Sequence, residues 1–406
     1  MKPRPPLPEG PYLVVGLARS GSAAAQMLRT HGTVIGVDSG RPEAPIGIEA
    51  HLETDGVHLL DRVRTVVKSP GVPKEVPVIR AAAERGLDVV GEMELAWRLL
   101  PNEFVAVTGT NGKTTTVELL GAMHRAAGVP VAVAGNVGTP LSALVGSIDP
   151  GTVIVCECSS FQLEDAMAFA PECAVLLNLE ADHIDRHGTF EAYRDAKLRI
   201  FANQGPDDVA IRPPFPPLPI PPEEVRLRGS HNLENAAAAS AAARARGLDA
   251  DAVAEALRTF AGVPHRLEEV AVASGVTWVN DSKATNPASA RVGIEAFEGG
   301  VHLIAGGSLK GGGFEELREP VASRCKAVYL IGEAADRLEA DLADTGVQLV
   351  RSGELERAVM RASRVVEPGD VVLLSPACAS FDQFADYEAR GDRFRRLARR
   401  WAPARG

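Results

Sequence analysis

The sequence predicts an α/β protein of three domains, and two observations support that fold class. Short apolar runs alternate with segments of helical period through most of the chain, which is the pattern of parallel α/β domains. The chain has 406 residues, and at about 100–200 residues per domain this length favours two to four domains. Boundaries near Pro101 and Val263 then give domains at residues 1–101, 102–263 and 264–406.

The first domain is predicted to begin with a buried strand at 12–16, followed by a Gly-containing turn and a helix at 22–32. A second strand, TVIGVD, ends at Asp38. A third strand, at 63–71, stops at a Ser-Pro-Gly turn, and a further helix is expected at 75–86. The segment therefore alternates between strands and helices.

The turn after the first strand, GLARSG at 16–21, is similar to the phosphate turn of dinucleotide-binding folds. Ala18 replaces the middle glycine of G-x-G-x-x-G, so the motif alone is weak and a plain packing turn is the alternative. Asp38 follows about 20 residues later, at a place where an acid can hold a ribose or a uracil.

The second domain is predicted from a strand at 104–108 that runs directly into a Gly-rich loop and a helix. Buried strands are expected at 152–157 and 173–179. The stretch 205–222 contains many prolines and cannot be a helix, so we expect a shortened or irregular connection there. An Ala-rich helix is expected at 232–246.

The third domain is expected to open with a hairpin-like pair at 268–281 and then to resume β/α alternation, with its clearest strands at 302–307, 327–333 and 370–375. Four of its loops, PHRLE, NDSKATNP, GGSLKGGGF and SPACASFDQF, place small or polar residues beside a charged group. Each loop alone is explained as a turn. Four of them in one β/α domain indicate a binding site.

Composition excludes several classes of protein. The net charge of −10 argues against an extended basic surface for nucleic acid. No apolar run reaches the roughly 18 residues that a membrane span needs, and the first ten residues lack the apolar core of a signal peptide. The five cysteines form no CxxC pair, which favours free thiols in a reducing compartment. We expect a cytoplasmic protein with neither membrane nor nucleic acid as a partner.

The strongest motif is FVAVTGTNGKTTT, which places Gly109, Gly112, Lys113 and Thr114 directly after a strand and before a helix, as a P-loop requires. The glycines let backbone N–H groups approach phosphate oxygens, Lys113 can reach the β- and γ-phosphates, and the Thr114 hydroxyl can ligate Mg²⁺. Val107 occupies the outer glycine position, which weakens the match to ordinary P-loop proteins. A Gly-rich turn without a ligand is the alternative.

Acidic residues follow the next two predicted strands. Glu157 ends an apolar strand, and an acid at that place beside a P-loop commonly ligates magnesium. The second cluster, in LNLEADHIDRHG, consists of Glu180, Asp182, His183, Asp185 and His187. The two histidines would suit zinc if they were helical. Because no cysteine is near and a nucleotide site is adjacent, we favour a magnesium- or substrate-linked role, with a polar capping loop as the alternative.

Eight strings occur in the order that they have in the Mur ligases of peptidoglycan synthesis: GTNGKTT, ECSSFQLE, NLEADHIDRHG, YRDAKLRIF, HNLEN, PHRLE, NDSKATNP and SPACASFDQFADYEARG. The chain resembles that family over all three domains. The resemblance implies a Rossmann-like N-terminal domain that holds UDP, a central P-loop ATPase domain, and a Rossmann-like C-terminal domain that closes over the nucleotide and binds the amino acid. The strings SSFQLE, NDSKATN and SPACASFDQF point to the branch that adds D-glutamate.

The resemblance also assigns residues to ligands. Lys113, Glu157, His183 and Lys197 form the implied catalytic set, with two Mg²⁺ ions held by Thr114 and Glu157 and by His183 and a carbamylated Lys197. The implied ATP contacts are Gly109, Thr110, Asn111, Gly112, Lys113, Thr114, Thr115, Asn235, Arg266 and Asp281. The implied UDP-substrate contacts are Arg19, Ser20, Asp38, Ser39, Ser69, Asn136, Ser159 and His183. The implied D-glutamate contacts are Lys283, Thr285, Lys310, Ser380 and Tyr387.

The implied reaction joins D-glutamate to UDP-N-acetylmuramoyl-L-alanine at the expense of ATP, through an acyl phosphate, in a monomeric enzyme. The residues suit this chemistry, because phosphorylating a carboxylate brings two anions together and calls for metal ions and a lysine. Addition of CO₂ to Lys197 would turn an amine into an anionic oxygen ligand. Ala18 and the short 205–222 segment depart from longer family members.

Three other functions compete with this one. A folylpolyglutamate-type or other Mur-type amide ligase shares the P-loop, but the residues before it suit a UDP domain better than a pterin pocket. A dinucleotide-binding oxidoreductase would explain GLARSG and Asp38 but not the P-loop or Lys197. A P-loop ATPase that drives a conformational switch is the third.

Overall fold

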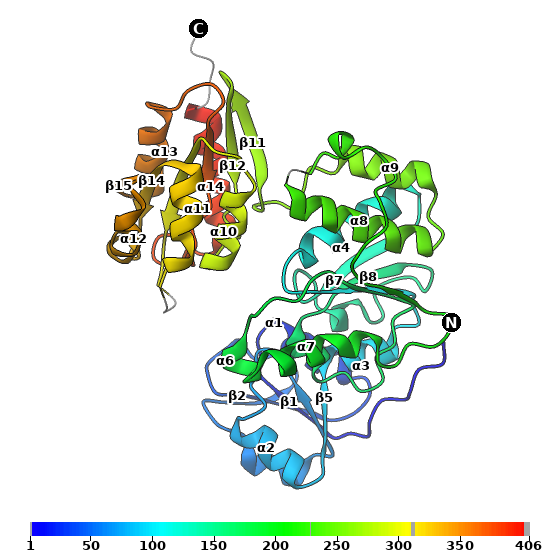
Figure 1. Cartoon of the computed structure of the whole chain (residues 1–406). Coiled ribbons are helices and arrows are strands. Elements are labelled where there is room, and N and C mark those ends of the chain that lie inside the picture. Colours follow the sequence, from blue (N-terminus) through cyan, green and yellow to red (C-terminus); the bar gives the residue numbers. More distant parts are fainter. Residues whose placement is uncertain (1, 228, 310–312, 402–406) are drawn as a thin grey trace. The chain divides into compact units, whose positions relative to one another are not determined.

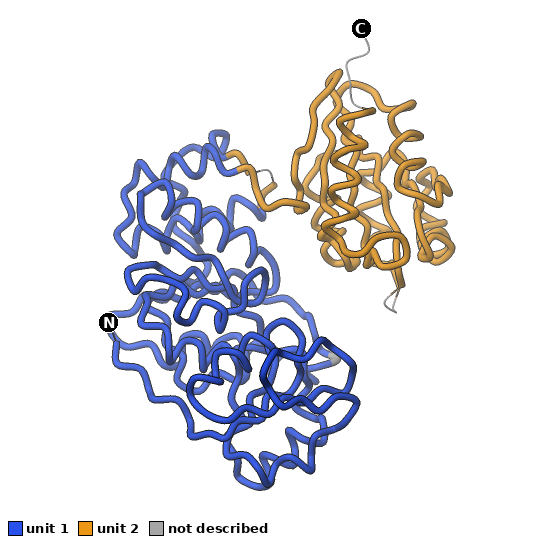
Figure 2. The backbone as a smooth tube through the Cα atoms, turned by 180° about the vertical axis from the view of Figure 1, so that it is seen from behind, with its two compact units in different colours: residues 1–225, 231–260 blue, residues 226–230, 261–406 orange. Residues whose placement is uncertain are grey.

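The computed structural model describes residues 2–227, 229–309 and 313–401. They divide into two compact units, one of residues 1–225 and 231–260 and the other of residues 226–230 and 261–406 (Figure 2). The first unit contains two parallel sheets and the second contains one mixed sheet. This arrangement confirms the predicted α/β class. The domain ranges 1–101, 102–263 and 264–406 stay a prediction.

The first sheet has the strand order β3-β2-β1-β4-β5, all parallel, which is the order of a Rossmann fold without its sixth strand. Its strands are β1 (Tyr12–Val15), β2 (Val34–Asp38), β3 (Glu49–Leu52), β4 (Thr65–Lys68) and β5 (Asp88–Gly91). Its helices are α1 (Arg19–Leu28), α2 (Pro77–Glu84) and α3 (Glu92–Leu99). The order reverses between β1 and β4, where such sheets bind ligands at the carboxyl ends of their strands.

The second sheet has the order β10-β9-β6-β8-β7, again all parallel (Figure 1). Its strands are β6 (Phe104–Thr108), β7 (Val131–Gly135), β8 (Val153–Glu157), β9 (Cys173–Leu176) and β10 (Val209–Ile211). The associated helices are α4 (Lys113–Ala126), α5 (Ser160–Leu163), α6 (Ile184–His187), α7 (Phe190–Leu198), α8 (Ser230–Ala245) and α9 (Ala250–Thr259). The central strand β6 is fully buried and leads into the predicted P-loop.

The third sheet, in the second unit, has the order β11-β12-β16-β13-β14-β15, in which only the β11–β12 pair is antiparallel. Its strands are β11 (Glu268–Ala273), β12 (Val276–Asn280), β13 (Val301–Gly306), β14 (Cys325–Ile331), β15 (Gln348–Gly353) and β16 (Val371–Leu374). Its helices are α10 (Pro287–Glu295), α11 (Arg318–Arg324), α12 (Ala335–Leu342), α13 (Leu355–Ser363) and α14 (Tyr387–Trp401).

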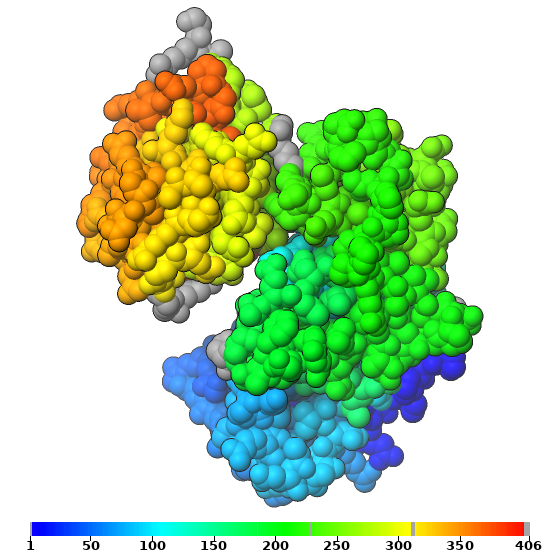
Figure 3. Space-filling view, viewed as in Figure 1, coloured from blue at the N-terminus to red at the C-terminus, as the bar shows by residue number. Residues whose placement is uncertain are grey.

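The two sheets of the first unit share one apolar core, which runs from Val14 in β1 to Phe104 in β6. Figure 3 shows the two parts of this unit, blue and green, packed directly against each other. Buried charges reinforce the contact. The Glu94 carboxylate on α3 accepts hydrogen bonds from the backbone N–H groups of residues 167–169 at 2.9–3.2 Å. The Arg4 guanidinium lies between the rings of Trp97 and Phe104.

Most predicted elements are confirmed, and the differences have local causes. The first helix begins at Arg19, three residues before its predicted start at 22, because Gly21 lets it pack closely on the preceding loop: a Cβ there would lie 1.7 Å from the Gly16 carbonyl oxygen. The irregular Pro-rich connection at 205–222 includes the short edge strand β10. No helix of the described residues is long and apolar enough to cross a membrane.

Candidate active site

The loop between β6 and α4 has the backbone shape of a phosphate-binding turn. Gly109 and Gly112 have φ values of 155° and 84°, and the latter is a left-handed conformation that L side chains rarely adopt. A Cβ on Gly112 would lie 2.1 Å from Asn235 Oδ1, on α8. No side chain caps the N-terminus of α4, so its first-turn N–H groups can receive a phosphate.

Residues from the segment after β9 and from α7 hold this loop in place. The Asn111 N–H donates to Asn178 Oδ1 at 2.8 Å, and the Thr110 N–H donates to the Asn178 carbonyl oxygen at 3.1 Å. The hydroxyls of Thr110 and Tyr193 lie 2.9 Å apart. Lys113 folds over the loop and donates to the carbonyl oxygens of Gly109 and Thr110 at 3.0 and 2.9 Å. The loop conformation is therefore set by contacts within the protein.

Glu157 meets the loop from the end of β8. Thr114 Oγ1 donates to Glu157 Oε2 at 2.8 Å, and Asn136 Nδ2 donates to Glu157 Oε1 at 3.0 Å. Only 2% of Glu157 is exposed. A hydroxyl and a buried carboxylate are the hard oxygen donors that Mg²⁺ prefers, and they stand beside the phosphate loop. Thr114 and Glu157 therefore fit one magnesium ion.

Lys197, on α7, reaches the same loop from its other side. Its Nζ donates to the Gly109 carbonyl oxygen at 2.7 Å and lies 4.7 Å from the centre of the Tyr193 ring. Burial, with a further contribution from the nearby charge of Lys113, lowers the pKa of Lys197 to about 7. A lysine held in this way has much of its amine in the neutral form, which is the form that reacts with CO₂.

The histidines of the acidic cluster differ in their surroundings. His183 precedes α6 with a φ of 52°, is 49% exposed in its side chain, and has its Nε2 3.4 Å from Asp182 Oδ2. His187 is buried, with its Nε2 3.0 Å from Ser160 Oγ and its ring stacked on Phe161. Burial lowers the pKa of His187. Within the described residues no group of three His, Cys, Asp or Glu is placed to hold a metal, so this pair gives no support to the zinc alternative.

Five of the eight predicted UDP-substrate contacts lie at or just after the carboxyl ends of β1, β2 and β4, whereas Asn136, Ser159 and His183 belong to the part of the unit that contains the second sheet. Asp38 accepts hydrogen bonds from the N–H groups of Leu17 and Gly40 at 2.7 and 2.8 Å, and Ser69 Oγ donates to the Gly16 carbonyl oxygen at 2.7 Å. Beside them lies a hollow of about 500 Å³ between the start of α1, which includes Arg19, and the 42–46 loop. Ser20 lies in the first turn of α1, and Ser39 directly follows β2.

The predicted nucleotide contact Asp281, in the second unit, follows β12. Its carboxylate accepts from Ser375 Oγ at 2.7 Å and from the Leu267 N–H at 3.2 Å. Burial raises the pKa of Asp281 to about 7, against the opposing effects of the Ser375 hydrogen bond and the Arg266 charge. Asp281 and Arg266 are thus close enough to influence each other.

The predicted D-glutamate contacts lie on neighbouring loops of the second unit. Lys283 Nζ is 6.0 Å from the centre of the Tyr387 ring. Ser380 is 2% exposed, and Thr285 is half-buried between Lys283 and the start of α10. Lys310 lies outside the described residues.

Comparison with known proteins agrees with this geometry. The Mur ligase middle domain matches residues 107–213, and the Mur ligase, glutamate ligase domain matches residues 265–378. The chain is 41% identical to the UDP-N-acetylmuramoylalanine–D-glutamate ligase of Pelotomaculum thermopropionicum, over 95% of this chain and 96% of that protein. It is 42% identical to the same ligase of Acidobacterium capsulatum, over 95% of each chain. The chain belongs to the Mur ligase family.

Solved Mur ligases share the fold at low sequence identity. The UDP-N-acetylmuramate–alanine ligase of Thermotoga maritima superposes with a TM-score of 0.56 at 19% identity, over 97% of this chain and 100% of that one. The MurF ligase of Thermotoga maritima, solved in complex with ADP, has a TM-score of 0.56 at 18% identity, over 97% and 96% of the chains. These likenesses extend over both units.

In this Mur ligase the first unit brings together the phosphate loop, Glu157, Lys197 and Asn235, whereas His183 remains half-exposed beside Asp182. The sequence analysis missed three residues that shape the site: Asn178, Tyr193 and Arg390. Asn178 could have been predicted from the sequence, since it follows β9, the buried strand next to β6. Tyr193 and Arg390 act through hydrogen bonds to residues far away in sequence, for which the sequence offers no local signal.

Proposed function

We propose that this Mur ligase joins D-glutamate to UDP-N-acetylmuramoyl-L-alanine, with conversion of ATP to ADP and phosphate, in peptidoglycan precursor synthesis. The observation that carries the proposal is the convergence of Thr114, Glu157 and Lys197 on one phosphate loop. The names of the relatives at 41% and 42% identity support D-glutamate as the amino acid.

The proposed reaction begins with transfer of the ATP γ-phosphoryl group to the alanyl carboxylate. Both partners are anions, so the groups around them have to offset their repulsion. The N–H groups at the start of α4 and the Lys113 ammonium face the phosphates in this scheme. The D-glutamate amine then attacks the acyl phosphate, and phosphate leaves from the tetrahedral intermediate. The outcome is an amide bond between L-alanine and D-glutamate.

We further propose two Mg²⁺ ions, which would supply charge neutralisation at the transferring phosphoryl group. Thr114 and Glu157 would hold one of them, and their contact at 2.8 Å supports this. His183 and a carbamylated Lys197 would hold the other. The support for the carbamate is the burial of Lys197, which is 2% exposed, beside Lys113.

The remaining ligand assignments are proposals as well. UDP would bind at Arg19, Ser20, Asp38, Ser39 and Ser69, next to the hollow at the start of α1. Asn136, Ser159 and His183 would contact the muramoyl part. Arg266 and Asp281 would contact ATP, and Lys283, Thr285, Lys310, Ser380 and Tyr387 would contact D-glutamate. We also propose that the enzyme acts as a cytoplasmic monomer.

Release of ADP tests the proposed function. The wild-type chain is incubated with ATP and Mg²⁺, with both co-substrates, with each one alone, and with neither. We expect release only when UDP-N-acetylmuramoyl-L-alanine and D-glutamate are both present, and none with L-glutamate or diaminopimelate. Release without either co-substrate would indicate an ATPase switch. Release with a pterin polyglutamate acceptor would indicate the other amide ligase.

A further inference from the structure

The second unit contains a buried arginine to which the proposed site gives no role. Arg390 lies in the first turn of α14 and is 1% exposed. Its guanidinium donates four hydrogen bonds. The acceptors are Ser282 Oγ at 2.9 Å and the carbonyl oxygens of Ser282, Cys378 and Ala379 at 2.9, 3.0 and 3.1 Å. One side chain therefore ties together two loops that are about a hundred residues apart in sequence.

The two loops are those that carry the candidate D-glutamate contacts. Lys283 follows Ser282 directly, and Ser380 follows Ala379 directly. Ser282 Oγ, which accepts from Arg390, also donates to the Tyr387 carbonyl oxygen at 2.8 Å. Arg390 thus fixes the backbone beside three of the five candidates.

Peptide geometry shows what this bonding does at Ser380. The Ala379 carbonyl oxygen accepts from Arg390 and also from the Ser308 N–H at 3.0 Å. In a planar trans peptide the C=O and N–H bonds point in opposite directions, so the Ser380 N–H points away from the guanidinium. Within the described residues this N–H has no hydrogen-bond acceptor. The Arg390 contact therefore sets the direction in which this N–H group points.

The charge of Arg390 is also unusual. Burial lowers the pKa of Arg390 to about 10, against the opposing effects of the nearby Cys378 and Asp382. Burying a cation is unfavourable even when its N–H groups are hydrogen-bonded. An anion bound nearby would offset that cost.

We infer that Arg390 is a positioning residue for the amino-acid substrate: its four hydrogen bonds hold the 282–283 and 378–380 segments in the arrangement that binds a dicarboxylate. This inference rests on the proposed function. Arg390 itself does not touch the reacting atoms; it acts through Lys283, Ser380 and Tyr387.

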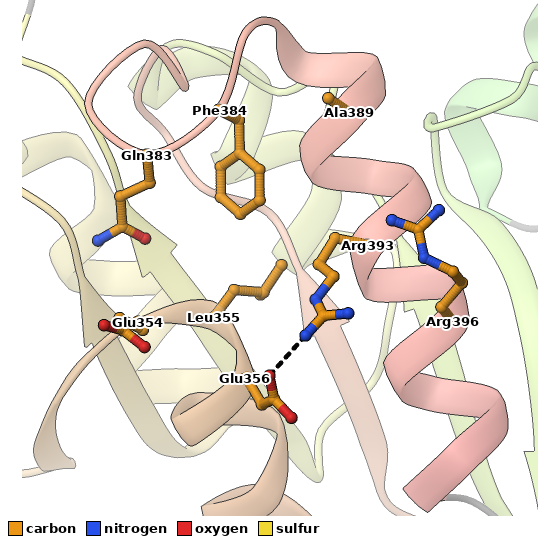
Figure 4. A pocket seen from close by; sticks show the side chains of 8 residues that line it. All are labelled: Glu354, Leu355, Glu356, Gln383, Phe384, Ala389, Arg393 and Arg396. Carbon is orange, nitrogen blue, oxygen red and sulfur yellow. Dashed lines mark hydrogen bonds and ion pairs between the residues drawn. The ribbon is translucent and has the colours of Figure 1, made fainter.

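Steady-state kinetics of Arg390→Lys test the inference, because lysine keeps the charge but loses the planar fork. We expect KM for D-glutamate to rise about tenfold to a hundredfold, as loss of hydrogen bonds to a charged group implies. KM for ATP and for the UDP substrate should stay within about twofold of wild type. Added guanidinium ion should partly restore KM for D-glutamate. The matched control is Arg393→Lys, one turn further along α14, where Arg393 pairs with Glu356 beside a surface hollow (Figure 4).

A second variant covers the case in which Arg390→Lys does not fold. Ser282→Ala removes one acceptor of Arg390 and the donor to Tyr387, and it should raise KM for D-glutamate about fivefold to tenfold. An unchanged KM for D-glutamate in the folded variants would overturn the inference. A rise of all three KM values together with a lower melting temperature would also overturn it, since this would mark a purely structural role.

The wild-type control separates this inference from the proposed function. If the wild-type chain forms ADP with a different amino acid only, the proposed function fails. The inference is then judged by KM for that amino acid in the same variants: a selective rise supports Arg390 as a positioning residue, and no rise overturns it.

Discussion

Lys197 Nζ and the Gly109 carbonyl oxygen are 2.7 Å apart, which joins a buried amine on α7 to the first glycine of the phosphate loop. The same carbonyl oxygen accepts a hydrogen bond from Lys113 at 3.0 Å. Two lysines therefore approach one backbone oxygen, and the charge of Lys113 disfavours the charged form of Lys197. This contact places the amine that the proposed carbamate requires beside the phosphate loop.

Lys197→Arg tests that arrangement. Arginine keeps a positive charge and a long side chain but cannot form a carbamate, so we expect ligation to be abolished while the fold is retained. ADP formation and thermal unfolding measure the two effects. Turnover at the wild-type level in this variant would contradict the proposed carbamate on Lys197.

Gly112→Ala tests the close approach of α8 to the loop. The new Cβ would lie 2.1 Å from Asn235 Oδ1, and the alanine backbone would be strained by the left-handed φ of Gly112. We expect ATP affinity to fall at least tenfold. Gly128→Ala is the control, because its φ is also left-handed at +69° but nothing lies within 4 Å; it should cost about 1 kcal/mol of stability and leave ATP affinity unchanged. Equal effects of the two variants on ATP binding would contradict the role of the loop.

Thr114→Val tests the proposed magnesium ligand. The substitution keeps the branched shape and removes the hydroxyl that meets Glu157 at 2.8 Å. We expect the Mg²⁺ concentration for half-maximal ADP formation to rise at least tenfold, whereas Thr114→Ser should remain close to wild type. A magnesium requirement that is the same in the valine variant would exclude Thr114 as a ligand.

Asp281→Asn tests the pH dependence of the second unit. The folded-state pKa of Asp281 is raised to about 7, above its unfolded value of about 3.8. Between these values the folded state binds more protons, so the contribution of Asp281 to stability falls as pH rises from about 4 to 7. Asparagine resembles the protonated acid. Calorimetry should therefore show the variant gaining stability relative to wild type between pH 5 and pH 8, and a constant difference would contradict the raised pKa.

Glu94→Gln tests the contact between the two sheets of the first unit. The amide would place its NH₂ group among backbone N–H donors that now face a carboxylate. We expect a loss of about 1.5–3 kcal/mol in the free energy of unfolding. Glu84→Gln, at an exposed position of α2, is the control and should be nearly neutral. Equal stability of both variants would show that the buried carboxylate is dispensable.

The sequence was informative where structure depends on local pattern. Buried strands such as β6 and β8 are continuous apolar runs, and the Gly and Lys residues of the phosphate loop carry their chemistry within a few positions. The edge strands β3, β5, β7, β10 and β15 were missed. They are short or partly exposed, so most of them show neither a continuous apolar run nor a clear apolar–polar alternation.

Most of the structural roles that the sequence did not predict depend on hydrogen bonds between residues far apart in the chain. Glu94 and Arg390 are charged residues that sequence analysis assigns to the surface, yet both are 1% exposed. Each is satisfied by backbone groups of a distant segment, and no spacing rule connects such partners. The bond of Tyr193 to the phosphate loop is of the same kind.

Product analysis tests the central claim most directly. The wild-type chain is incubated with ATP, Mg²⁺, UDP-N-acetylmuramoyl-L-alanine and isotope-labelled D-glutamate, and the UDP-linked product is isolated and fragmented by mass spectrometry. The account predicts labelled D-glutamate in amide linkage to the alanine carboxyl group, formed in equal amount to ADP. ADP formed without incorporation of the label into the UDP-linked product would contradict it.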